Sequence, residues 1–148
     1  MQKRLTTGII ILAAICFFHI TVHADPIQEW KRRAKEESKA MVVYFFSQFC
    51  SYCEAMDRAV LGDKEIAAVL KKDFIYLRID AEKNLDITRK NGIRGYPTTM
   101  LIESNGKKID KIPGYIEKKR FKLILSYLKG KHYKTIGLRE FLTTAESR

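Results

Sequence analysis

Cysteine, histidine and proline are scarce in this 148-residue chain, which has three of each. His19 and His23 fall in an apolar leader, so His132 is the one histidine in the rest of the sequence. Structural zinc usually takes four ligands, and a Cys–His hydrolase needs a histidine that activates its thiol. The shortage of histidine therefore disfavours both kinds of site.

A hydrophobic run long enough to cross a membrane is also lacking. Residues 1–24 combine three features of an export signal: the basic start Lys3-Arg4, the apolar middle Gly8 to Ile20, and the small-x-small pattern Val22-His23-Ala24. The apolar middle is shorter than the roughly 20 residues of a membrane span. We expect a cleaved signal peptide at 1–24 and a periplasmic protein. An uncleaved anchor, or a lipid anchor on Cys16, is the alternative.

Only two cysteines follow the leader, in the motif Cys50-Ser51-Tyr52-Cys53, and they come soon after the apolar run at 41–46. A thiol at the start of a helix lies at the positive end of the helix dipole, near unpaired amides. Both effects favour the thiolate, which is the form that attacks disulfides. A disulfide between residues this close constrains almost no loop. The pair is therefore predicted to be reactive rather than structural.

Acidic residues are fewer than basic residues in this chain. The net charge is +11, and it falls to +9 once Lys3 and Arg4 are removed with the leader. The basic residues are scattered over predicted helices and turns, which is typical of a solvated surface, and we expect no nucleic-acid partner. The apolar content of 46% suits one domain with a real core. We place this domain at 25–129 and a C-terminal extension, which packs on it or frays from it, at 130–148.

The hydrophobic pattern predicts helices that alternate with strands before a terminal hairpin. Such an order is typical of an α/β fold with a central mixed sheet flanked by helices. The predicted elements are a helix at 26–39, a strand at 41–47, a helix at 51–60, a helix capped by Asp63, a strand at 74–80, a helix at 84–91 ending at Gly92, strands at 98–103 and 107–112 joined by Asn105-Gly106, a helix at 117–129 and a short helix at 138–142, with fraying from Thr144.

Three features together resemble the thioredoxin superfamily: the CxxC after an apolar strand, the segment from Asn91 to Thr98 that contains Pro97, and the Asn105-Gly106 hairpin followed by Pro113-Gly114. The resemblance covers about residues 38–129. The chain looks most like the thioredoxin-like proteins of the bacterial envelope, which include periplasmic thiol:disulfide oxidoreductases of the disulfide-interchange type. The resemblance implies a thioredoxin fold, no cofactor, a cis Pro97 opposite the dithiol, and a Tyr96 backbone that pairs with an extended substrate.

The resemblance also implies the chemistry. Cys50 attacks a partner disulfide as a thiolate, and Cys53 then resolves the mixed disulfide. We expect an exported reductase of envelope proteins, because the chain has neither an inserted helical domain nor a dimerisation domain. A membrane thiol-transfer protein is the expected electron donor, and a monomer is expected. An oxidase, an isomerase or a copper-binding protein of the same fold is the alternative.

The sequence departs from thioredoxin at positions that handle protons. Tyr44 and Tyr76 stand where thioredoxins carry a buried aspartate and a lysine. Neither serves as a base near pH 7, since the reference pKa of tyrosine is about 10. Asp57, one helical turn after Cys53, is our candidate proton acceptor. The alternatives are Glu54, water, or a merely solvated Asp57.

Two aromatic residues flank the first cysteine. Phe49 replaces the tryptophan that usually precedes it, and Tyr52 lies in the dipeptide that tunes the family's redox potential. We therefore do not transfer thioredoxin's potential to this chain. Phe49, Tyr52 and Tyr96 are the predicted substrate-binding residues.

Overall fold

The protein is described by a computed structural model that covers residues 26–147. The expected signal peptide at 1–24 and the alternative anchor Cys16 lie outside these residues. In chain order the elements are α1 (Pro26–Glu36), β1 (Met41–Phe46), α2 (Ser51–Met56), the π-helical turn η1 (Asp57–Leu61), α3 (Lys64–Asp73), β2 (Ile75–Asp80), α4 (Leu85–Lys90), β3 (Thr98–Ile102), β4 (Lys108–Pro113), α5 (Lys118–Lys129), the 3₁₀ turn η2 (His132–Lys134) and α6 (Leu138–Glu146).

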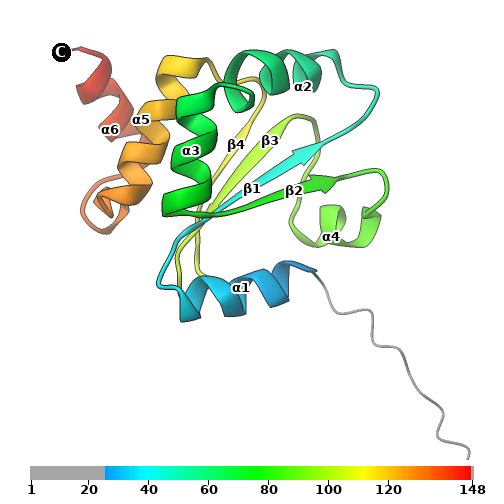
Figure 1. Ribbon diagram of the computed structural model, residues 1–148, viewed down its shortest axis with the longest axis horizontal. Coiled ribbons are helices and arrows are strands. Elements are labelled where there is room, and N and C mark those ends of the chain that lie inside the picture. The colour runs from blue at the N-terminus through cyan, green and yellow to red at the C-terminus, as the bar shows by residue number, and fades with distance from the viewer. Residues whose placement is uncertain (1–25, 148) are drawn as a thin grey trace, which may run out of the picture.

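The four strands form one mixed sheet in the order β2-β1-β3-β4 (Figure 1). β1 and β2 are parallel, whereas β1 pairs antiparallel with β3, and β3 with β4. The predicted α/β fold with a central mixed sheet flanked by helices is confirmed. Among residues 26–147, no helix combines the length and the apolar character needed to cross a bilayer.

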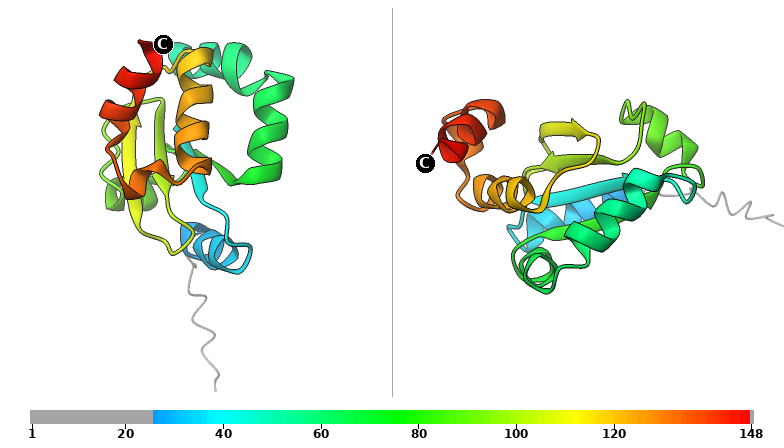
Figure 2. Two further views of the ribbon diagram at one scale, coloured as in Figure 1. Left: turned by 90° about the vertical axis from the view of Figure 1, so that its left-hand side faces the viewer. Right: turned by 90° about the horizontal axis from the view of Figure 1, so that it is seen from above.

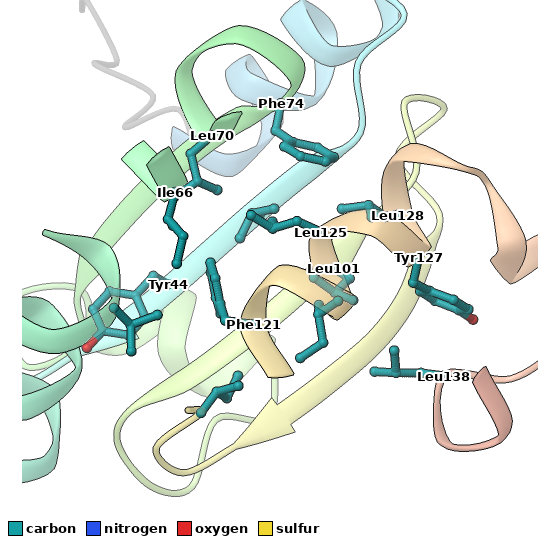
Figure 3. Packing of buried hydrophobic residues seen from close by; sticks show 14 of the residues in the cluster. Tyr44, Ile66, Leu70, Phe74, Leu101, Phe121, Leu125, Tyr127, Leu128 and Leu138 are labelled. Atoms are coloured by element: carbon teal, nitrogen blue, oxygen red, sulfur yellow. The ribbon is translucent and has the colours of Figure 1, made fainter. Parts of the chain in front are cut away.

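Helices cover both faces of the sheet (Figure 2). Because side chains alternate along a strand, Met41, Val43 and Phe45 face one cluster that also takes in residues of α1. Val42 and Tyr44 face the other cluster, with residues of α3, α5 and α6. Figure 3 shows the labelled members of this second cluster gathered between the helices and the sheet. β1 is therefore buried on both faces, as its continuous apolar sequence predicts.

The strand register brings four chain segments to one end of the sheet. Phe46, the last residue of β1, pairs with Asp80, the last residue of β2. Thr98 opens β3 beside Phe45 on one side and Pro113 on the other. The segments that follow β1, β2 and β4, and the segment that precedes β3, therefore meet at this end. Cys50 lies in the first segment and Pro97 in the last.

Local sequence signals place several element ends correctly. The Asp63 carboxylate caps α3 by accepting from the backbone N–H groups of Glu65 and Ile66, at 3.0 and 3.1 Å. Gly92 follows α4 with φ +63°, and Gly106 in the hairpin turn has φ +87°. Both backbone conformations favour glycine. The predicted cap, helix end and turn are confirmed.

Three predicted boundaries are wrong. The first helix ends at Glu36 instead of Lys39, because Ser38 takes a left-handed backbone with φ 54°. The helix expected at 51–60 widens after Met56 into η1, where the Gly62 N–H bonds to the Asp57 carbonyl at 2.8 Å.

The last correction concerns the C-terminal extension. The chain does not fray from Thr144, since α6 continues to Glu146. Two contacts with α5 hold it: the Tyr127 and Phe141 rings lie 5.2 Å apart, and Arg120 pairs with Glu146 at 3.5 Å. Figure 1 shows α6 beside α5.

Candidate dithiol site

Cys50 and Cys53 form a disulfide at the start of α2, with their Cα atoms 5.2 Å apart. Cys50 is the N-cap residue, and its Sγ accepts a hydrogen bond from the Cys53 backbone N–H at 3.1 Å. The Cys50 carbonyl accepts from the backbone N–H groups of Cys53 and Glu54, at 3.0 and 3.1 Å. The first sulfur therefore lies among the amides of the first helical turn, which stabilise a thiolate once the disulfide is reduced.

The two sulfurs differ in access. Cys50 is half-buried, whereas the Cys53 side chain is 1% exposed. The residues beside Cys50 are exposed aromatics, Phe49 at 90% and Tyr52 at 67%. A protein partner can therefore approach the Cys50 sulfur over an apolar rim, which consists of Phe49 and Tyr52. The buried Cys53 sulfur is accessible to Cys50 of the same chain.

The loop that delivers Cys50 is tied to the segment after β2. The Ser47 hydroxyl donates to the Glu82 carboxylate at 2.8 Å and accepts from the Phe49 backbone N–H at 3.1 Å. The Gln48 amide donates to the Asp80 carboxylate at 3.2 Å. These bonds fix the loop between β1 and α2, and so fix the position of the dithiol relative to the sheet.

Pro97 lies at the same end of the sheet and is buried. The Tyr96–Pro97 peptide bond is cis. The Pro97 carbonyl accepts from the Gly114 N–H at 2.7 Å, and the Thr98 hydroxyl donates to the Gly95 carbonyl at 2.8 Å. Tyr96 is half-buried. Its pairing with a substrate backbone stays a prediction, as does substrate contact by Phe49 and Tyr52.

Two tyrosines of the sheet pack in or against the cluster that also holds residues of α2, η1 and α3. The Tyr44 hydroxyl donates to the Cys53 carbonyl at 3.3 Å. Burial holds the pKa of Tyr44 far above its ordinary value, and burial raises the pKa of Tyr76 to about 12. Both side chains therefore stay neutral at pH 7. Within residues 26–147 the buried Tyr76 hydroxyl has no hydrogen-bond partner.

Asp57 is bound by a residue that the sequence analysis missed. Both carboxylate oxygens of Asp57 accept hydrogen bonds from the guanidinium of Arg78 on β2, at 2.9 and 2.8 Å. Asp57 is therefore both paired and partly exposed, and its role as proton acceptor stays a prediction. The signal that would have pointed to Arg78 is a charged residue inside an apolar strand.

His132, the histidine considered for a copper site, lies in η2. Both views in Figure 2 place the segment between α5 and α6 far from α2. Within residues 26–147, no three His, Cys, Asp or Glu side chains are grouped so that they could hold a metal ion.

Comparisons with known proteins agree with this geometry. Residues 27–129 match the family model described as a thioredoxin-like domain. Thioredoxin of Mycoplasmoides gallisepticum is 32% identical over 89 residues, which is 60% of this chain and 83% of that protein. Protein disulfide isomerase-like 2-2 of Oryza sativa is 31% identical over 74 residues, which is 49% of this chain. The match spans only 19% of that relative's length.

Solved structures show the same fold. A thioredoxin-fold protein from Helicobacter pylori superposes with a TM-score of 0.64 at 22% identity, covering 74% of this chain and 80% of the other. A thioredoxin from Thermus thermophilus gives a TM-score of 0.59 at 22% identity, covering 67% and 80%. Identities this low establish the fold alone.

Proposed function

The chain belongs to the thioredoxin-like domain family, and on that premise we propose that it is an exported thiol-disulfide oxidoreductase that reduces disulfides in envelope proteins. The observation that carries the proposal is the asymmetry of the pair. A half-buried Cys50 caps the helix, and its disulfide partner Cys53 is buried one turn further along. This arrangement suits a first sulfur that meets the client and a second that resolves the intermediate.

The reaction starts from the reduced pair. The Cys50 thiolate attacks one sulfur of a client disulfide, that bond breaks, and the other client sulfur leaves as a thiolate. The Cys53 thiolate then attacks the Cys50 sulfur and releases the second client thiolate. The client gains two electrons and takes two protons from solvent. The chain ends as the Cys50–Cys53 disulfide, the state that this structure holds.

A further turnover needs a thiol donor. We propose a membrane thiol-transfer protein in this role, because an exported reductase cannot draw on thiols inside the cell. The proposal of export rests on residues 1–24, which read as a signal peptide with Lys3 and Arg4 at its start. Its direct test is the N-terminal residue of the protein recovered from the cell envelope, which should be Asp25.

The central experiment is reduction of insulin disulfides with dithiothreitol as the thiol donor. Cys50→Ser should abolish the reaction. Reduced Cys53→Ser, freed of dithiothreitol before insulin is added, should accumulate mixed disulfides visible on non-reducing gels. Full turnover by Cys50→Ser would refute the assignment of the nucleophile. Because Cys16 offers a third thiol in the full chain, the same assay with Cys16→Ser is the control and should match the parent.

The redox potential of the Cys50–Cys53 pair decides whether the protein reduces or oxidises its clients. A potential more reducing than the glutathione couple supports the reductase, whereas a potential well above it would point to an oxidase. Renaturation of scrambled ribonuclease measures isomerase activity separately. If active ribonuclease is recovered faster than insulin is reduced, the proposed function changes from reductase to isomerase.

A further inference from the structure

The Arg78 side chain of β2 contacts three residues near the dithiol helix. Its guanidinium makes two hydrogen bonds to the Asp57 carboxylate, at 2.9 and 2.8 Å. It also lies over two rings of β1, 4.8 Å from the centre of Phe46 and 5.4 Å from the centre of Tyr44. Tyr44 in turn donates to the Cys53 carbonyl. The side chain of Arg78 therefore connects the edge strand β2 and the central strand β1 to the helical turn that follows the cysteines.

Asp57 follows the buried Cys53 by one turn of the helix. The Asp57 backbone N–H bonds to the Cys53 carbonyl, so the two residues are one helical turn apart. Side chains at this spacing share a helix face, with their Cβ atoms about 5–6 Å apart. Cys53 is 1% exposed, so water screens it poorly. An unpaired carboxylate at residue 57 would oppose a thiolate at residue 53.

The other titratable groups on these elements leave the pair as the main charged feature beside Cys53. Tyr44 and Tyr76 are neutral at pH 7, because burial raises the pKa of each. Glu54 is exposed on α2 and pairs with Arg58. Asp80 at the end of β2 and Glu82 just after it bind the loop that precedes Cys50.

We propose that Arg78 is a positioning residue of the resolving step: it holds the Asp57 carboxylate in a neutral pair and so removes a negative charge that would oppose the Cys53 thiolate. This rests on the proposed function only in so far as Cys53 resolves the mixed disulfide. In that step the Cys53 thiol loses its proton to solvent, and its sulfur bonds to the Cys50 sulfur. The Cys50–client bond breaks, and the client leaves as a thiolate.

The size of the effect follows from the spacing. A unit charge about 6 Å away in a partly screened site changes a thiol pKa by about one unit, or tenfold in the thiolate fraction at neutral pH. A more basic thiolate is also a better nucleophile, with a Brønsted slope of about 0.4–0.5, so the rate changes by only about threefold. Loss of Arg78 should raise the pKa of Cys53, whereas loss of the Asp57 charge should lower it.

The test isolates the Cys53 thiol in chains that carry Cys16→Ser and Cys50→Ser, and follows thiolate absorbance against pH. Arg78→Met should raise the pKa of Cys53 by about one unit and Asp57→Asn should lower it. In the double variant, the pKa of Cys53 should lie within about 0.3 units of the value in the parent chain. Arg58→Met is the matched control, because Arg58 pairs with Glu54 on the exposed side of the same helix, and it should cause no shift.

A rate measurement completes the test in chains that keep both active-site cysteines. The mixed disulfide of Cys50 with thionitrobenzoate releases a coloured thiol as Cys53 attacks. At pH 7 Arg78→Met should slow this release about threefold, and Asp57→Asn should accelerate it. If Asp57→Asn slows the release, Asp57 is the proton acceptor and the proposal is overturned. The proposal is also overturned if both single variants shift the pKa of Cys53 in the same direction.

Arg78→Lys guards against a trivial loss of structure, and circular dichroism confirms folding. A lysine keeps the positive charge but loses the two-pronged geometry, so the pKa of Cys53 should stay within about 0.3 units of the parent. A shift as large as that of Arg78→Met would show that packing, and not charge, is responsible. Because the released thiol is a small molecule, these results do not depend on whether the protein reduces envelope proteins.

Discussion

Two tyrosines on neighbouring strands should respond oppositely to the loss of one oxygen atom. The Tyr44 hydroxyl donates to the Cys53 carbonyl at 3.3 Å. The Tyr76 hydroxyl is buried and has no partner among residues 26–147. The same substitution to phenylalanine therefore removes a hydrogen bond at one position and an unsatisfied polar group at the other. Each variant is the control for the other.

The magnitudes follow from these contacts. Tyr44→Phe should lower the free energy of unfolding by about 0.5–1 kcal/mol, the lower part of the range for one hydrogen bond. The loss is at this end because the bond is long and the Cys53 carbonyl keeps the N–H of Asp57. Tyr76→Phe should raise the free energy of unfolding by up to about 1 kcal/mol, since an unsatisfied buried hydroxyl costs about 1–3 kcal/mol and this side chain is only partly buried.

Urea unfolding of the oxidised protein, followed by circular dichroism, measures both changes. With a slope of about 2 kcal/mol per molar urea, the two unfolding midpoints should lie about 0.25–1 M apart, with Tyr76→Phe the higher. A loss of stability in Tyr76→Phe as large as that in Tyr44→Phe would refute the reasoning. It would mean that the Arg78 guanidinium, which counters the effect of burial on the pKa of Tyr76, also stabilises this hydroxyl.

Two further predictions concern the rim of the site and the cap of α3. Phe49→Ser, which leaves the Ser51-Tyr52 dipeptide unchanged, should cut kcat/KM for insulin about fivefold, equivalent to about 1 kcal/mol of lost contact. The rate with oxidised glutathione should not change, and an equal fall with both substrates would contradict a protein-docking role. The Lys118 ammonium and then the Ile66 amide hold the pKa of Asp63 below its ordinary value. A lowered pKa adds stability above the unfolded pKa of about 3.9, and this stability is lost as pH falls through the folded pKa. Asp63→Asn should therefore lower Tm at pH 7, with the difference vanishing near pH 2; a difference that persists at pH 2 would contradict the ion-pair account.

The positions that the sequence predicted well share one property, which is that their cause is local. Asp63 caps a helix that begins at the next residue, and Gly106 supplies the positive φ of a turn. The placement of Cys50 at a helix start needs only an apolar strand followed by a short loop. In each case the interacting groups are a few residues apart, so the pattern itself contains both partners.

The wrong prediction for the C-terminal end has a cause that lies further away along the chain. The fraying predicted from Thr144 ignored α5, whose Arg120 pairs with Glu146 and whose Tyr127 packs against Phe141. Polar residues at a chain end read as unstructured when their partners lie in another element. The widened turn at η1 was likewise not visible in the pattern, which fits an ordinary helix there.

The chain's own residues determined that a dithiol follows a buried strand, because strand, loop and helix N-terminus are consecutive in the sequence. The resemblance to thioredoxin implied in addition that its usual proton acceptor is absent, since Tyr44 and Tyr76 stand where thioredoxins carry an aspartate and a lysine. Only the tertiary structure decided what lies under Cys53 instead. The parallel pairing of β1 with β2 sets Arg78 beside Tyr44, and the helix turn after Cys53 brings Asp57 to the same guanidinium. Strand register and helix packing are properties of the whole fold, so a contact between residues 21 positions apart appears only once the fold has formed.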